Sequence, residues 1–178
     1  QGNFKKAEVY FNEVAENPGS GQFRASALFK IGSILVKNDK LRESLPKFKK
    51  ILELPADEDT LERSLYNLGV VYKRLREYEK SSRYFNRLIK ISKKSEMKSD
   101  ALISMGEIYE VMGLSQKAEE SYSTVITEGT DKQQVEAEFW LGSLYLKQEK
   151  YDLAIEEFMK IVYLYKEFTM WVNSARFK

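Results

Sequence analysis

The sequence predicts an all-α fold in which helical hairpins repeat along the chain and stack as a right-handed α-solenoid. Four glycines inside helical apolar patterns follow one another at steps of 37, 37 and 36 residues: Gly32, Gly69, Gly106 and Gly142. Each is followed, at the same distances in every copy, by a small residue, an aromatic ring and an aliphatic residue, which in the first copy are Ser44, Phe48 and Ile51. This constant spacing indicates a two-helix unit of fixed length, joined to the next unit by a link of variable length.

Each glycine lies in the first helix of its unit. In the first three copies the residues four before, one before and three after the glycine, such as Leu65, Leu68 and Tyr72, form one apolar stripe, because positions three and four apart share a helix face. The fourth copy keeps Leu141 and Tyr145 of this stripe. A glycine inside a helix costs roughly 1 kcal/mol relative to alanine, so its recurrence at one phase indicates a packing role. We expect the glycine to face the small residue of the second helix, with the ring and the aliphatic residue on the flanks.

Helix starts are predicted at two places by capping-box spacing, in which a capping residue is followed three positions later by Glu or Gln. Asp59 precedes Glu62 in this way, and Thr130 precedes Gln133. Both pairs stand at the beginning of a predicted first helix.

The repeat divides the chain into one array over residues 1–178. The expected units are a partial repeat at 1–18, repeats at 22–56, 59–94, 96–129 and 131–168, and the start of a further repeat at 170–178. Because the units at both ends are incomplete, we expect the chain to be a fragment of a longer protein.

The glycine with a tyrosine three residues later, followed by the small residue and the ring of the second helix, resembles the tetratricopeptide repeat family over nearly the whole chain. The spacing of the repeat glycines is longer than the period of roughly 34 residues that is typical of that family. The segment 171–175 is also similar to bacterial cell-envelope tetratricopeptide proteins. That similarity favours the periplasm or cell envelope over the cytoplasm, and the localisation is otherwise unknown.

The resemblance implies a protein–protein interaction scaffold or adaptor that binds a peptide or helix in the concave groove lined by the first helices. Residues off the apolar stripe, including those three before and one and four after each glycine, are expected to face this groove. The candidate partner-binding residues are Phe29, Ser33, Tyr66, Asn67, Val70, Lys73, Ile103, Glu107, Glu110, Phe139, Trp140 and Ser143. Apolar anchors of this kind suit an amphipathic or extended segment. The alternative is that the large rings pack between adjacent repeats.

Composition argues against an enzyme. The chain has no His and no Cys, which removes the commonest general bases, metal ligands and nucleophiles. We therefore expect no catalytic residues, no metal site and no cofactor.

The expected partner is a protein or peptide. The net charge of +2 is too small for broad nucleic-acid binding, although the basic region from Arg74 to Lys94 keeps weak polyanion binding open. No apolar run approaches the roughly 20 residues that cross a bilayer, so we expect no membrane insertion of this segment. The oligomeric state is unknown, and the alternative function is a self-assembly module of a larger envelope protein.

Overall fold

The computed structural model describes residues 2–17, 19, 21, 23–93 and 95–178, and the side chains of residues 2–8 and 95 are not described. The predicted repeat ends at residues 1, 18, 22 and 94 lie outside the described residues, as does Lys94 of the basic region. The bounds of the individual repeats therefore stay a prediction.

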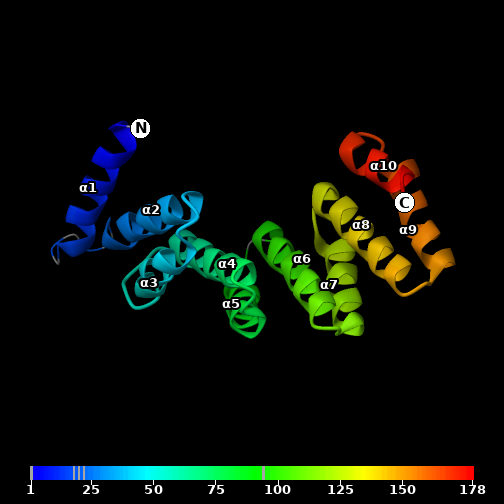
Figure 1. The fold of residues 1–178 in the computed structure, drawn as a ribbon, viewed down its shortest axis with the longest axis horizontal. Helices are drawn as coiled ribbons and strands as arrows, with labels where there is room; N and C mark the ends of the chain where they lie inside the picture. Colours follow the sequence, from blue (N-terminus) through cyan, green and yellow to red (C-terminus); the bar gives the residue numbers. More distant parts are fainter. Residues whose placement is uncertain (1, 18, 20, 22, 94) are drawn as a thin grey trace. The chain divides into compact units, whose positions relative to one another are not determined.

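The first of two compact units spans Gln1–Ile91 and contains five helices among its described residues (Figure 1). They are α1 (Gly2–Glu16), α2 (Phe23–Lys37), α3 (Leu41–Ile51), α4 (Glu58–Arg74) and α5 (Tyr78–Ile91). Helices α2 and α3 form one hairpin and α4 and α5 the next, and α3 also packs on α4.

The second unit spans Ser92–Lys178 and repeats this arrangement. Its helices are α6 (Ser95–Val111), α7 (Ser115–Glu128), α8 (Asp131–Lys147), α9 (Tyr151–Leu164) and α10 (Thr169–Arg176). Helices α6 and α7 form one hairpin, α8 and α9 form another, and α7 packs on α8. The predicted all-α class and the predicted solenoid of helical hairpins are confirmed.

A ring of the second helix lies directly over each repeat glycine. A Cβ atom built on Gly32 would stand 2.8 Å from the ring of Phe48, and one on Gly69 would stand 2.6 Å from the ring of Phe85. Both distances are shorter than real Cβ contacts, so only glycine leaves room for the ring. The same contact joins Gly106 to Tyr122 and Gly142 to Phe158.

The sequence prediction puts the small residue opposite the glycine and the ring on the flank, whereas the ring lies opposite the glycine. The small residue lies beside it. In the hairpin of α4 and α5, the hydroxyl of Ser81 donates to the carbonyl oxygen of Gly69 at 2.6 Å, and Ser81 is fully buried. Close approach of the helices needs both the bare glycine and a small neighbour.

One turn geometry joins the two helices of every hairpin. The residue seven after each repeat glycine has a positive φ: Asp39 at 60°, Arg76 at 59°, Gly113 at 73° and Glu149 at 60°. In the first turn, the N–H of Lys40 donates to the carbonyl of Leu35 at 2.9 Å, and the N–H of Asp39 donates to the carbonyl of Val36 at 3.1 Å. This pair of bonds is the Schellman motif that ends a helix on a left-handed residue.

The two predicted capping boxes have different outcomes. The N–H of Thr130 donates to the side-chain oxygen of Gln133 at 3.2 Å, so the box at the start of α8 is confirmed. At the start of α4 the capping residue is Asp57 rather than Asp59. Its carboxylate accepts from the N–H of Thr60 at 2.8 Å, and this bond lowers the pKa of Asp57.

A pair of carboxyl groups is buried between α8 and α9 in the second unit. Glu138 is 4% exposed and Glu157 is 7% exposed. The ammonium of Lys160 lies 3.0 Å from Glu157, whereas one carboxyl oxygen of Glu138 has no hydrogen-bond partner among the described residues. Burial, and then the hydrogen bond to Glu157, raise the pKa of Glu138 to about 8. Glu138 therefore keeps its proton near neutral pH.

This proton links the stability of the second unit to pH. The folded pKa of Glu138 lies above its unfolded value near 4.5. Its contribution to the free energy of unfolding is therefore fully present below about pH 4.5 and is lost as the pH rises through about 8. We expect the free energy of unfolding to fall by a few kcal/mol, on the order of 1.4 per pKa unit, between pH 5 and pH 9. Urea unfolding at a series of pH values measures this. Glu138→Gln should flatten the profile, and an equally steep fall in that variant would contradict the assignment.

Candidate functional site

The first helices of successive hairpins lie side by side in each unit. Helix α2 contacts α4 in the first unit, and α8 contacts both α6 and α10 in the second. The side of these helices that points away from their own second helices is called the first-helix face below. It is the surface on which the sequence predicts the candidate groove residues.

In the first unit, Phe29 does not belong to this face. Its ring is buried and meets the ring of Phe48 edge-on, with centroids 5.8 Å apart. Tyr66 of α4 makes the same contact with Phe85 at 5.7 Å and is half-buried. Both rings pack inside their own hairpins, so Phe29 is a core residue and Tyr66 is largely one.

The reason is the angle around the helix. A residue three before the glycine stands about 60° from it at 100° per residue, and the glycine itself points at the ring of the second helix. The ring three residues before the glycine therefore lies close enough to pack against the same ring of the second helix. The expected alternative, packing between adjacent repeats, describes Phe29 in part, because its ring packs within its hairpin and is also covered by a residue of α4.

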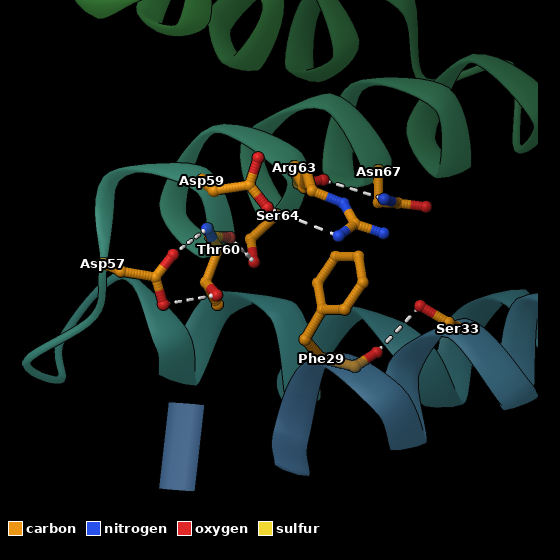
Figure 2. A network of polar contacts seen from close by, with 8 residues as sticks. All are labelled: Phe29, Ser33, Asp57, Asp59, Thr60, Arg63, Ser64 and Asn67. Atoms are coloured by element: carbon orange, nitrogen blue, oxygen red, sulfur yellow. Dashed lines mark hydrogen bonds and ion pairs between the residues drawn. The ribbon is translucent and has the colours of Figure 1, made fainter. Parts of the chain in front are cut away.

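Arg63 of α4 covers the remaining surface of Phe29. Figure 2 shows its side chain reaching from α4 over the Phe29 ring of α2, and the guanidinium carbon lies 4.6 Å from the ring centroid. The guanidinium of Arg63 forms an ion pair with the carboxylate of Asp59 at 3.3 Å, and both side chains are about half exposed. Such a cation over an aromatic face contributes roughly 0.5 to 1 kcal/mol at an exposed site.

Two further polar side chains, Asn67 and Ser33, are hydrogen-bonded to their own helices. Asn67 donates from its amide nitrogen to the carbonyl of Arg63 at 2.8 Å, as Figure 2 shows, and the hydroxyl of Ser33 donates to the carbonyl of Phe29 at 2.8 Å. These bonds orient both side chains along their own helices. Val70 and Lys73 lie on α4 and are half-buried. The first unit therefore presents a polar first-helix face around Arg63 and Asn67.

In the second unit, several candidate residues are occupied or buried. Ile103 and Ser143 are buried, which removes them from an open groove. Glu110 accepts from the hydroxyl of Tyr122 at 2.7 Å and from the ammonium of Lys147 at 2.6 Å, so its carboxylate is already paired. Glu107 is half-buried on α6.

An aromatic cluster forms the apolar part of this unit's first-helix face. Phe139 meets Trp140 at 5.7 Å, Phe158 at 5.8 Å and Trp171 of α10 at 5.2 Å, measured between ring centroids. Phe139, Trp140 and Trp171 are half-buried, so each keeps part of its surface open. Phe139 thus packs both within its hairpin and against the next first helix.

Sequence reasoning missed two of these residues. Arg63 lies six residues before Gly69, about 120° from it, on the side of α4 that faces away from α5. Counting positions from the glycine at 100° per residue identifies it. Trp171 had no such signal, because its contact with Phe139 joins different hairpins.

Among the described residues, no group of three or more His, Cys, Asp and Glu side chains is arranged to hold a metal ion. Within the same residues, every helix is too short or too polar to cross a membrane.

The comparisons with known proteins agree with the repeat. A family model for the tetratricopeptide repeat matches residues 62–95 and 135–168. No curated protein matches the chain significantly. Among solved structures, MamA is 21% identical with a TM-score of 0.79, and the match covers 95% of this chain and 92% of MamA.

Two further structures show the same fold. YrrB, a tetratricopeptide repeat protein with an unusual peptide-binding site, is 17% identical with a TM-score of 0.74 over 98% of this chain and 84% of its own. A tetratricopeptide repeat protein from Parabacteroides merdae is 18% identical with a TM-score of 0.79 over 98% of this chain and 65% of its own. The family model thus identifies a tetratricopeptide repeat in two segments of the chain, and the solved structures show that the chain shares their fold of stacked helical hairpins.

Proposed function

We propose that the chain is a protein-interaction scaffold that binds a peptide or a helix of a partner protein on its first-helix faces. The repeat fold supports this role, as does its similarity to YrrB, which has a peptide-binding site. The observation that carries the proposal is the aromatic cluster of Phe139, Trp140 and Trp171, whose rings are anchored in the core yet remain partly open.

The two units offer different chemistry. In the second unit, rigid rings at Trp140 and Trp171 give large apolar contact area at low cost in side-chain entropy, which is typical of binding hot spots. In the first unit, the guanidinium of Arg63 and the amide of Asn67 suit the carbonyl oxygens of an extended or helical segment. A partner that combines an apolar anchor with exposed acceptors fits these surfaces.

The test begins with a displayed library of random peptides, from which the peptides that bind the chain are selected. Trp140→Ala should weaken the binding of the selected peptides roughly 10- to 30-fold, because removing a hot-spot ring costs about 2 kcal/mol of binding free energy. Asn67→Ala should weaken the binding of peptides that reach the first unit. Asn86→Ala, at an exposed position of α5, is the control and should leave the affinity unchanged. Titration calorimetry measures the affinities, and circular dichroism checks that each variant keeps its helices. Peptides that bind all three variants as tightly as the parent chain would contradict binding on the first-helix faces.

Self-assembly is the second candidate function, favoured by the outer surface of α9. Ile155, Met159 and Tyr163 follow one another at four-residue spacing and are 55%, 48% and 62% exposed. Together with Phe158 and Val162 they line an apolar groove of roughly 350 Å³. A second copy of this chain is the occupant that we propose, because two such faces bury each other's apolar surface in a symmetric contact.

Sedimentation velocity over a range of protein concentrations measures this association. The parent chain should form a concentration-dependent dimer, and Met159→Glu should shift it to monomer because a carboxylate would be buried without a partner. Gln116→Glu, which adds the same charge at an exposed position of α7, should leave the dimer unchanged. A parent chain that stays monomeric at high concentration would rule out this function for α9.

A further inference from the structure

A basic pocket lies on the second-helix side of the first unit. It has a volume of about 370 Å³ and is formed by α3, α4 and α5. Its lining residues are Lys49, Tyr72, Lys80, Arg83, Tyr84 and Arg87. Four cations and two phenols thus surround one hollow, and the lining contains no carboxylate.

Two of the lining residues are tyrosines whose rings stack. The rings of Tyr72 and Tyr84 stack with centroids 5.5 Å apart and an angle of 4° between their planes. The ammonium groups of Lys49 and Lys80 lie 5.5 Å and 5.6 Å from the centre of the Tyr72 ring. A hydrogen bond to Tyr72 raises the pKa of Lys49, so this lysine stays charged throughout the neutral range.

The positive charges exceed the negative ones beside them. Glu77 accepts from Lys80 at 2.6 Å and lies 3.5 Å from Arg42, which satisfies one of the four lining cations. Within the described part of the first unit, no ion pair or hydrogen bond is formed by the side chains of Arg83 and Arg87. These two arginines are four residues apart and therefore share one face of α5.

The pocket is separate from the first-helix face. Tyr72 follows Asn67 by five residues, which places the two side chains about 140° apart around α4 at 100° per residue. Arg83 and Arg87 are carried by a second helix, which takes no part in the first-helix face. A ligand of this pocket would therefore bind beside any peptide held on the first-helix face.

We propose that this pocket binds an acidic segment of a partner protein, with Asp or Glu carboxylates paired to Arg83, Arg87 and Lys49. Planar guanidinium groups recognise carboxylates through two parallel hydrogen bonds, and the tyrosine hydroxyls add neutral donors. The inference goes beyond the proposed function, because it assigns a second site on different helices with a different ligand chemistry.

A single-stranded nucleic acid fits the pocket less well. Such ligands bind where bases stack on open aromatic faces along a continuous basic groove. Tyr72 is 3% exposed, and its ring is covered by Tyr84 and by the two lysines. Glu77 and Glu79 also interrupt the basic surface at the start of α5. A short acidic peptide can bind through a few carboxylates, and the few cations of the pocket are enough to pair with them.

The test uses the whole chain and a fluorescent ten-residue peptide that alternates Asp and Glu with Gly and Ser. Fluorescence anisotropy should show binding at low salt that weakens as NaCl rises, because the contact is between charges. The Arg83→Gln, Arg87→Gln double variant should bind at least tenfold more weakly. The control is the Lys30→Gln, Lys40→Gln double variant, which removes two charges from exposed residues of the same unit that do not line the pocket.

Three outcomes would overturn the proposal. They are no binding of the acidic peptide by the parent chain, equal loss of affinity in both double variants, or tighter binding of a thymidine oligonucleotide with the same number of charges. A matched peptide with Asn and Gln in place of Asp and Glu should not bind. Trp140→Ala should leave acidic-peptide binding unchanged, so failure of this site and failure of the first-helix face are distinguishable.

Discussion

The contact between a glycine and the ring of the following helix is the constraint on which the hairpins depend. Gly69 shows it most simply: Phe85 lies where a Cβ atom would stand, and Phe85 is fully buried. Because the same pair recurs in all four hairpins, the two helices of each hairpin pack against each other through the same contact. The ring three residues before the glycine then packs edge-on or tilted against the same second-helix ring in three of these hairpins, as in Phe29 with Phe48, Tyr66 with Phe85 and Phe139 with Phe158.

This constraint also determines which residues remain for a partner. Once the glycine points at the second helix, side chains near it are committed to packing, and only part of the far side of the helix is left on the first-helix face. Val71 and Ile108, two residues after their glycines and about 160° from them, are fully buried. Arg63 and Asn67 remain on the first-helix face in the first unit, and Trp140 does so in the second. The pocket at Lys49, Arg83 and Arg87 arises on the other side of the hairpins, where the second helices carry basic residues. One packing rule thus leaves two surfaces of different chemistry.

The fold could be predicted from the sequence because its signal is a spacing, and a spacing repeated four times is insensitive to any single residue. The site could be predicted only in part. The sequence prediction places Phe29 and Ile103 in the groove because it centres the packed face on the apolar stripe, whereas the glycine is at its centre. That choice rotates the expected surface by roughly 60°, so the side chains of Phe29 and Ile103, which are buried, are predicted to be open.

Other features depend on contacts that no local pattern carries. Asp59 has the capping-box spacing, yet Asp57 caps the helix, because the cap depends on the backbone conformation before the first turn. The left-handed turn residue is a glycine only at Gly113, so Asp39, Arg76 and Glu149 give no compositional signal. The contact of Trp171 with Phe139 and the burial of Glu138 beside Glu157 both require the packed hairpins to be known.

A double-mutant cycle on Gly69 and Phe85 tests the central claim most directly. Urea unfolding gives the free energy of unfolding of the parent chain, Gly69→Ala, Phe85→Leu and the double variant. If the ring fills the space of the missing Cβ atom, Gly69→Ala alone should cost about 1 to 3 kcal/mol, because it overpacks the contact. In the double variant the smaller leucine should relieve that overpacking, so the total should fall short of the sum of the single changes by about 1 kcal/mol or more. Effects that add within about 0.5 kcal/mol would contradict the account.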